Sequence, residues 1–147
     1  MNRVFSLSML SLAVLCAGAG IASAQSMPDL KGTWTGTSKS IVAGLAPHHP
    51  TSTPAKPAGP NRLTEVKFTA KIEGQEDSRF WGTQGSATKV EPFIGVLSAD
   101  GKRLRIITQG GGMIDGVVTS PDSIEIFYTE HEAGVSVAAT NVWMRQK

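Results

Sequence analysis

The sequence predicts an all-β protein whose domain is an eight-stranded antiparallel barrel of up-and-down topology. From residue 32 onward, no segment of helical length places apolar residues three and four positions apart. Short runs rich in β-branched and aromatic residues recur instead, and turn residues separate them. The eight runs are residues 33–42, 62–72, 79–83, 92–98, 103–108, 113–119, 123–129 and 135–145.

Alternation within these runs indicates which side chains face the core. In residues 64–72 every even-numbered residue is apolar or threonine, whereas the odd-numbered residues are charged or threonine. In the seventh run, Ile124, Ile126 and Tyr128 share one face and oppose Glu125 and Phe127. Successive side chains of a strand point to opposite faces, so each strand is expected to have one buried and one wet face.

The connections between the runs alternate between tight and loose. Residues 74–77, 99–101 and 120–122 are short and rich in Gly, Pro and Asp, which is typical of tight turns. Residues 43–61, 84–91, 109–112 and 130–134 form the looser set. Since successive connections of a meander lie at opposite ends of the sheet, we expect a closed end of hairpins and an open end of longer loops.

Eight antiparallel strands remove their exposed edges by closing into a barrel. A barrel of this size has an interior that is either filled by side chains or holds one small ligand. Strand number and period do not choose between these two interiors. They also leave a two-sheet β-sandwich open as the alternative fold.

Residues 1–24 have the pattern of a secretory signal peptide. Arg3 precedes an apolar run over residues 4–15, and the small residues that follow end in an A-x-A site at Ala24. Cleavage after Ala24 would release a periplasmic or secreted protein, and the apolar run is too short to span a membrane. Cys16 would leave with the leader, so the domain is expected to fold without a disulfide. Leu15 stands where lipid-anchored precursors have a small residue, which favours free export over anchoring.

Residues 25–147 are enough for a single domain, with residues 43–61 as a Pro-rich loop. The formal net charge of the whole chain is only +2, and no basic cluster is present. We therefore expect neither nucleic-acid binding nor attraction to an anionic membrane, and no integral membrane segment in the domain. Strands flank the Pro-rich loop on both sides, so we interpret it as a flap over the open end.

The two ends of the domain resemble the calycin superfamily of lipocalins, fatty-acid-binding proteins and avidins. The first strand carries Gly32-Thr33-Trp34, similar to the Gly-x-Trp of these barrels, and Arg145 matches the basic residue of their last strand. The resemblance implies that Arg145 packs on Trp34 at the barrel base and that residues 27–30 plug it. Gly36 stands where biotin-binding proteins place an asparagine. The resemblance therefore implies a barrel that binds a small molecule, but not biotin.

A ligand pocket is the site that this architecture predicts. Strand residues that would line the interior supply apolar surface and a few polar contacts. Ile126 and Val137 are further candidates, and the faces of Trp81 and Trp143 stay open because Phe80 and Val142 compete for them. The predicted ligand-binding residues are Ser38, Phe68, Trp81, Phe93, Ile106, Tyr128 and Asn141.

The three histidines are the residues to consider for a metal site. His48 and His49 lie in the first connection and His131 in the seventh, which share the predicted open end. Neighbouring side chains of an extended chain diverge, so we expect no metal there, and no motif for a cofactor was found.

Three classes of function follow from the sequence. The favoured one is an exported barrel that binds a small apolar or amphipathic molecule. An alternative is a periplasmic interaction or inhibitor module whose open-end loops contact an exported protein. A second alternative is a cyclase-like barrel enzyme using Glu91, Asp115 or Tyr128 for acid-base chemistry. The chain has no Gly-x-Ser-x-Gly motif, and residues 109–115 lack the lysine of a phosphate loop, so we do not predict an enzyme.

Overall fold

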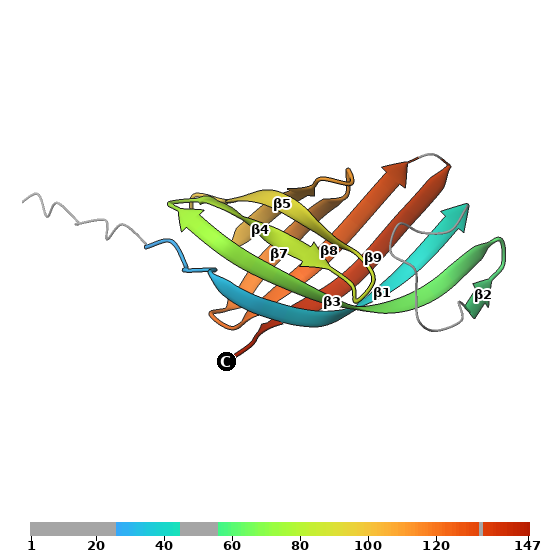
Figure 1. Cartoon of the computed structure of the whole chain (residues 1–147), viewed down its shortest axis with the longest axis horizontal. Coiled ribbons are helices and arrows are strands. Elements are labelled where there is room, and N and C mark those ends of the chain that lie inside the picture. The colour runs from blue at the N-terminus through green and yellow to red at the C-terminus, as the bar shows by residue number, and fades with distance from the viewer. Residues whose placement is uncertain (1–25, 45–55, 133) are drawn as a thin grey trace, which may run out of the picture.

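A computed structural model describes residues 26–44, 56–132 and 134–147, which form one antiparallel sheet that closes into a barrel (Figure 1). Each of the strands β3 to β8 pairs with its successor, and β1 pairs with both β9 and β3. Eight strands therefore form the closed barrel, and the prediction of the fold is confirmed. The strands are β1 (Gly32–Gly44), β2 (Lys56–Ala58), β3 (Asn61–Glu76), β4 (Arg79–Gly85), β5 (Val90–Leu97), β6 (Arg103–Thr108), β7 (Met113–Ser120), β8 (Ser123–Glu132) and β9 (Val135–Arg145).

The strands agree closely with the predicted runs, and the differences lie at their ends. β3 continues to Glu76 because its pairing with β4 resumes after an irregularity between Ile72 and Gly74. The short strand β2, which pairs with the first residues of β3, was not predicted. The predicted signal peptide and most of the Pro-rich loop lie outside the described residues.

The alternation of connections between two ends is confirmed, but the open end is not a ring of long loops. β8 and β9 stay paired up to Glu132 and Val135. The β6–β7 connection is closed by hydrogen bonds from Thr108 N to Gly112 O (3.0 Å) and from Gly111 N to Thr108 O (3.1 Å). The β8–β9 connection is short because both strands continue to pair into residues that the sequence assigned to a loop. The β6–β7 connection has its predicted bounds, residues 109–112, and is a tight turn.

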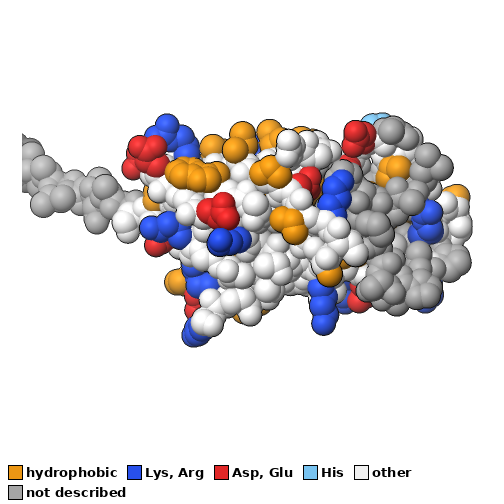
Figure 2. Space-filling model, in the orientation of Figure 1, with side chains coloured by type: hydrophobic (Ala, Val, Ile, Leu, Met, Phe, Trp, Pro, Cys, Tyr) orange, Lys and Arg blue, Asp and Glu red, His pale blue; other side chains and the backbone are white. Residues whose placement is uncertain are grey.

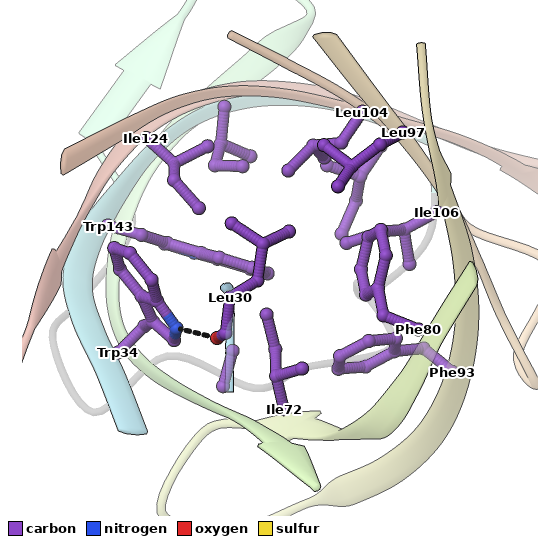
Figure 3. Close-up of a cluster of buried hydrophobic side chains, with 13 residues drawn as sticks. Leu30, Trp34, Ile72, Phe80, Phe93, Leu97, Leu104, Ile106, Ile124 and Trp143 are labelled. Atoms are coloured by element: carbon purple, nitrogen blue, oxygen red, sulfur yellow. Dashed lines mark hydrogen bonds between the residues drawn. The ribbon is translucent and has the colours of Figure 1, made fainter. Parts of the chain in front are cut away.

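The closed end, which we call the base, is filled by side chains (Figure 3). Leu30, from the segment before β1, lies in the middle of a ring of residues from every side of the barrel and is 1 % exposed. Phe80 and Phe93 meet edge to face with their ring centroids 6.2 Å apart. Burial of these large apolar groups is the main stabilisation of the fold. The cluster contains Leu30, Trp34, Ala70, Ile72, Phe80, Phe93, Leu97, Leu104, Ile106, Ile114, Ile124, Ile126 and Trp143.

The barrel wall has unequal height around its circumference. On one side β8, β9, β1 and β3 are long, and on the other side β4 to β7 are short. The pairing of β3 with β4 ends at Thr69 and Gly85, so residues 64–68 of β3 extend past the end of β4 (Figure 1). The long strands therefore form a tall wall along one side of the open end. We call this open end the mouth.

The outer surface carries apolar side chains over β4 to β6 (Figure 2). Trp81, Ile94 and Ile107 are directly paired across these three strands, and all three are more than 40 % exposed. The described residues contain no helix, so none of them belongs to a helix that could cross a membrane.

Candidate ligand-binding site

A cavity of about 50 Å³ lies inside the mouth of the barrel. All of its lining residues except Gln84 and Ile114 come from the tall wall of β1, β3, β8 and β9. The interior is thus divided: side chains fill the base, and a space remains above them. This answers the question of a filled or hollow barrel that the sequence left open.

Small inward-facing residues of β1 and β9 leave room for the cavity above the base. In β1 the inward positions between Trp34 and Val42 are Gly36, Ser38 and Ser40, and in β9 Ala139 lies opposite Ser40. None of these side chains reaches across the barrel as the indole rings of the base do. The floor is apolar, because Trp143, Ile126 and Ile114 from the core form it.

Asn141 brings an unpartnered polar group into this cavity. It lies on β9, its side chain is only 7 % exposed, and it lines the cavity. Its Oδ1 atom is buried without a hydrogen-bond partner among the described residues. Gly36 makes room for this amide, since a Cβ at that position would be 2.2 Å from Oδ1. A buried amide without a partner costs about 1–3 kcal/mol of stability, so its retention points to a use outside folding.

Tyr128 and Glu130 form the other polar group of the cavity. The Tyr128 hydroxyl donates a hydrogen bond of 2.9 Å to Oε2 of Glu130, whose carboxylate is 8 % exposed. Burial raises the pKa of Tyr128 well above its usual range, and the negative charge of Glu130 and the hydrogen bond to it raise it further. The phenol therefore keeps its proton at neutral pH and acts as the donor. Gly112 permits this position, because a Cβ there would be 2.5 Å from the hydroxyl oxygen.

Further polar side chains complete the lining. Ser38 and Ser40 come from β1, Thr64 from β3 and Gln84 from β4. Hydroxyl and amide groups of this kind can both donate and accept hydrogen bonds. The cavity therefore combines an apolar floor with a belt of hydrogen-bonding groups and one carboxylate, which suits a small molecule with an apolar and a polar part.

Four of the seven predicted ligand-binding residues meet in this cavity, namely Ser38, Phe68, Tyr128 and Asn141. Phe93 and Ile106 also point inward, but they lie in the filled core of the base and do not line the cavity. The additional candidates Ile126 and Val137 line it as well.

The prediction that Trp81 lines the interior is wrong. Phe80 takes the inward position and is 1 % exposed, so its neighbour Trp81 must point outward, where it is 47 % exposed. Its indole ring lies over Gly74 of β3, whose missing side chain leaves room for it. The sequence pattern could not show which of the two adjacent aromatic residues points inward, because both are large and apolar. The same ambiguity is resolved the other way in β9, where Trp143 is buried and Val142 is exposed.

Glu130 is the main site residue that the sequence reasoning missed. It stands two residues after Tyr128, so the period of a strand places both on one face. The predicted run ends at residue 129 and leaves Glu130 in the connection 130–134, so the prediction does not include this residue. β8 in fact continues through Glu130 to Glu132.

The predicted structural pair at the base is confirmed. The Arg145 guanidinium lies 4.2 Å from the centre of the Trp34 ring and donates a hydrogen bond of 2.8 Å from Nη2 to Asp29 O. Trp34 is fully buried and donates from Nε1 to Leu30 O at 2.9 Å (Figure 3). Leu30 and its neighbours thus plug the base as the resemblance implied.

The other sequence candidates do not form a site among the described residues. His48 and His49 lie outside them, and the exposed His131 forms a hydrogen bond of 2.9 Å with Ser136 Oγ. No group of three potential metal ligands occurs in the part of the chain that is described. Asp115 lies on the outer face in an ion pair with Arg105 at 2.8 Å, so it is not an acid or base of the interior.

Glu91 is buried, but its position is structural. Its Oε2 accepts a hydrogen bond of 2.9 Å from Gly110 N and so fixes the β6–β7 turn. It does not line the cavity of the mouth.

No protein-family model and no curated protein sequence matches the chain. Among solved structures, the S-type phycobiliprotein lyase from Guillardia theta aligns with 80 % of this chain and 89 % of its own chain, at 12 % identity and a TM-score of 0.39.

Proposed function

We propose that this protein is an exported binding protein that holds a small amphipathic molecule in the mouth of its barrel. The observation that carries the proposal is the buried amide of Asn141, which has no partner at Oδ1 among the described residues and lines a cavity with an apolar floor. Groups of this kind destabilise a fold unless something binds them. The export part rests on the signal-peptide pattern of residues 1–24, which lie outside the described residues.

The size of the cavity limits the ligand. About 50 Å³ is room for a few water molecules, whereas pockets for drug-sized ligands are about 300–1,000 Å³. We therefore propose that a group of a few non-hydrogen atoms is enclosed, and that any larger remainder extends through the mouth. A long acyl chain wholly inside the barrel does not fit this volume.

A matched pair of substitutions on β9 tests the proposal. Ala139 lines the cavity and is 8 % exposed, whereas its neighbour Ala138 is exposed on the outer face. Ala139→Phe should fill the cavity, and Ala138→Phe should add the same ring outside it. The full chain is expressed in a bacterium, recovered from the exported fraction, and examined by mass spectrometry of the denatured protein for a copurified small molecule.

Binding of small amphiphiles is then measured by NMR, with n-butanol, n-butylamine and butyrate as probes. At least one compound should shift the amide resonances of residues around the cavity in the wild type and in Ala138→Phe, but not in Ala139→Phe. If no small molecule copurifies and none of the three probes binds the wild type, the proposed function is wrong.

A further inference from the structure

Glu130 places a carboxylate in the cavity that no basic group of the described residues compensates. It is nine-tenths buried, and its one hydrogen bond among the described residues comes from Tyr128. None of the ion pairs between described residues involves Glu130. A carboxylate has about four acceptor positions, so most of the hydrogen-bonding capacity of Glu130 is unused. Burial of a charge in this state is costly unless a cation or strong donors approach it.

The described surroundings of Glu130 are negative or neutral. The carboxylates of Glu130, Glu91 and Glu132 all act on the Tyr128 phenol in the direction that disfavours its ionisation. Of the basic side chains described at this end, Arg62 donates to Gly44 O at 2.9 Å, and Lys39 and Lys56 line a groove on the outer surface. None of the described residues that line the cavity is basic.

From these contacts we propose that the cavity recognises the protonated amine of a small organic cation, with Glu130 as its counter-ion. This rests on the proposed function, which supplies the site, and adds the chemical class of the ligand. The ammonium group replaces the water that would otherwise solvate the carboxylate and forms a charge-assisted hydrogen bond with it. The apolar part of the ligand lies toward Trp143 and Ile126.

Two other features of the cavity fit a cation of this kind. Tyr128, Phe68 and Trp143 bring aromatic surface to the same space, and aromatic faces attract ammonium groups. A metal ion is a poor occupant by comparison. Hard cations take six or more oxygen ligands, and Glu130 is the only carboxylate among the lining residues that the structure describes.

The three probes differ in charge but have the same four-carbon chain, so they separate charge recognition from apolar binding. For the unmodified protein, n-butylamine should bind at least about tenfold more tightly than n-butanol, since a hydrogen bond to a charged group contributes about 1.5–3 kcal/mol. Butyrate should bind more weakly than both, because Glu130 repels it. Dissociation constants come from NMR titrations at neutral pH.

Glu130→Gln tests the counter-ion directly because it keeps the size of the side chain and removes the charge. It should bring the affinity for n-butylamine down to that for n-butanol. Glu125→Gln is the matched control, since Glu125 lies on the same strand but is exposed on the outer face. That control should leave all three dissociation constants unchanged.

The inference is overturned if n-butanol binds the unmodified protein as tightly as n-butylamine, or if Glu130→Gln leaves the preference for the amine intact. In either case binding that Ala139→Phe abolishes would still support the proposed function. Absence of binding by all three probes overturns the inference, and it overturns the proposed function as well if no small molecule copurifies with the wild type. The comparison of the three probes on the unmodified protein needs no variant, so it decides the matter even if Glu130→Gln does not fold.

Discussion

The base and the mouth of the barrel are made by the same strands with the same alternation, yet their interiors differ in packing and in hydrogen bonding. At the base, Trp34 is fully buried, its Nε1 atom has a partner in Leu30 O, and Arg145 stacks on its ring. At the mouth, Ser38, Ser40 and Ala139 are small enough to leave a cavity, and Asn141 is buried without a partner for Oδ1 among the described residues.

The difference indicates that the base contributes more to the stability of the fold than the mouth does. Large apolar groups and satisfied polar groups are concentrated at one end, so the other end can carry groups that reduce stability. Polar groups that are buried but unsatisfied are expected at functional sites and are rare in a packed core. Substitutions at the two ends should therefore change the free energy of unfolding in opposite directions.

The largest effect is expected from Trp34→Ala at the base. Loss of a buried Trp typically reduces the free energy of unfolding by about 3–5 kcal/mol, and here the contact with Arg145 is lost as well. Ser38→Ala is the control, because Ser38 lies on the same strand and face, four residues nearer the mouth. It should change stability by less than about 1 kcal/mol. Urea unfolding followed by circular dichroism measures both; equal losses would show that the two ends are not different in this respect.

The sequence predicted the eight strands of the barrel because the information for single strands is local. Period-two patterns in residues 64–72 and the turn residues between runs indicate these strands without knowledge of long-range contacts, but they predicted neither β2 nor the choice of a barrel over a sandwich. Gly32-Thr33-Trp34 and Arg145 even indicated which ends of the first and last strands meet, and their contact at 4.2 Å confirms this.

The site could be predicted only in part, because a cavity depends on what several distant residues leave empty. Asn141 and Tyr128 follow from their position on inward faces, whereas Trp81 and Phe80 compete for one face and the pattern cannot rank them. Strand length was the other limit. Glu130 faces the cavity only because β8 continues to Glu132 by pairing with β9, and that pairing is a tertiary contact.

An intermediate effect of opposite sign is expected from Asn141→Val at the mouth. Valine is apolar, β-branched and similar in size, so it removes the unsatisfied amide and suits a strand. The free energy of unfolding should rise by about 1 kcal/mol, while the affinity for the probe that binds the wild type falls. Thr140→Val, one residue away on the outer face, serves as the control and should change neither quantity by much. A loss of stability in Asn141→Val would mean that the amide contributes to folding after all.

The smallest effect at neutral pH, and the most specific one, concerns Tyr128. Burial and the carboxylate of Glu130 raise its pKa in the folded protein above the ordinary value of 10.0. The folded state then holds this proton more tightly than the unfolded state, so the contribution to stability is complete below pH 10 and is lost as the pH rises above it.

The pKa of Tyr128 can be measured directly because it is the one tyrosine of the chain, so the ultraviolet absorbance of phenolate reports on it alone. The native protein should show no phenolate near pH 10, whereas urea-unfolded protein should titrate there. Glu130→Gln removes the charge but not the burial, so it should lower the pKa only part of the way toward the unfolded value. A native titration that coincides with the unfolded one would show that the phenol is not held in the mouth by Glu130.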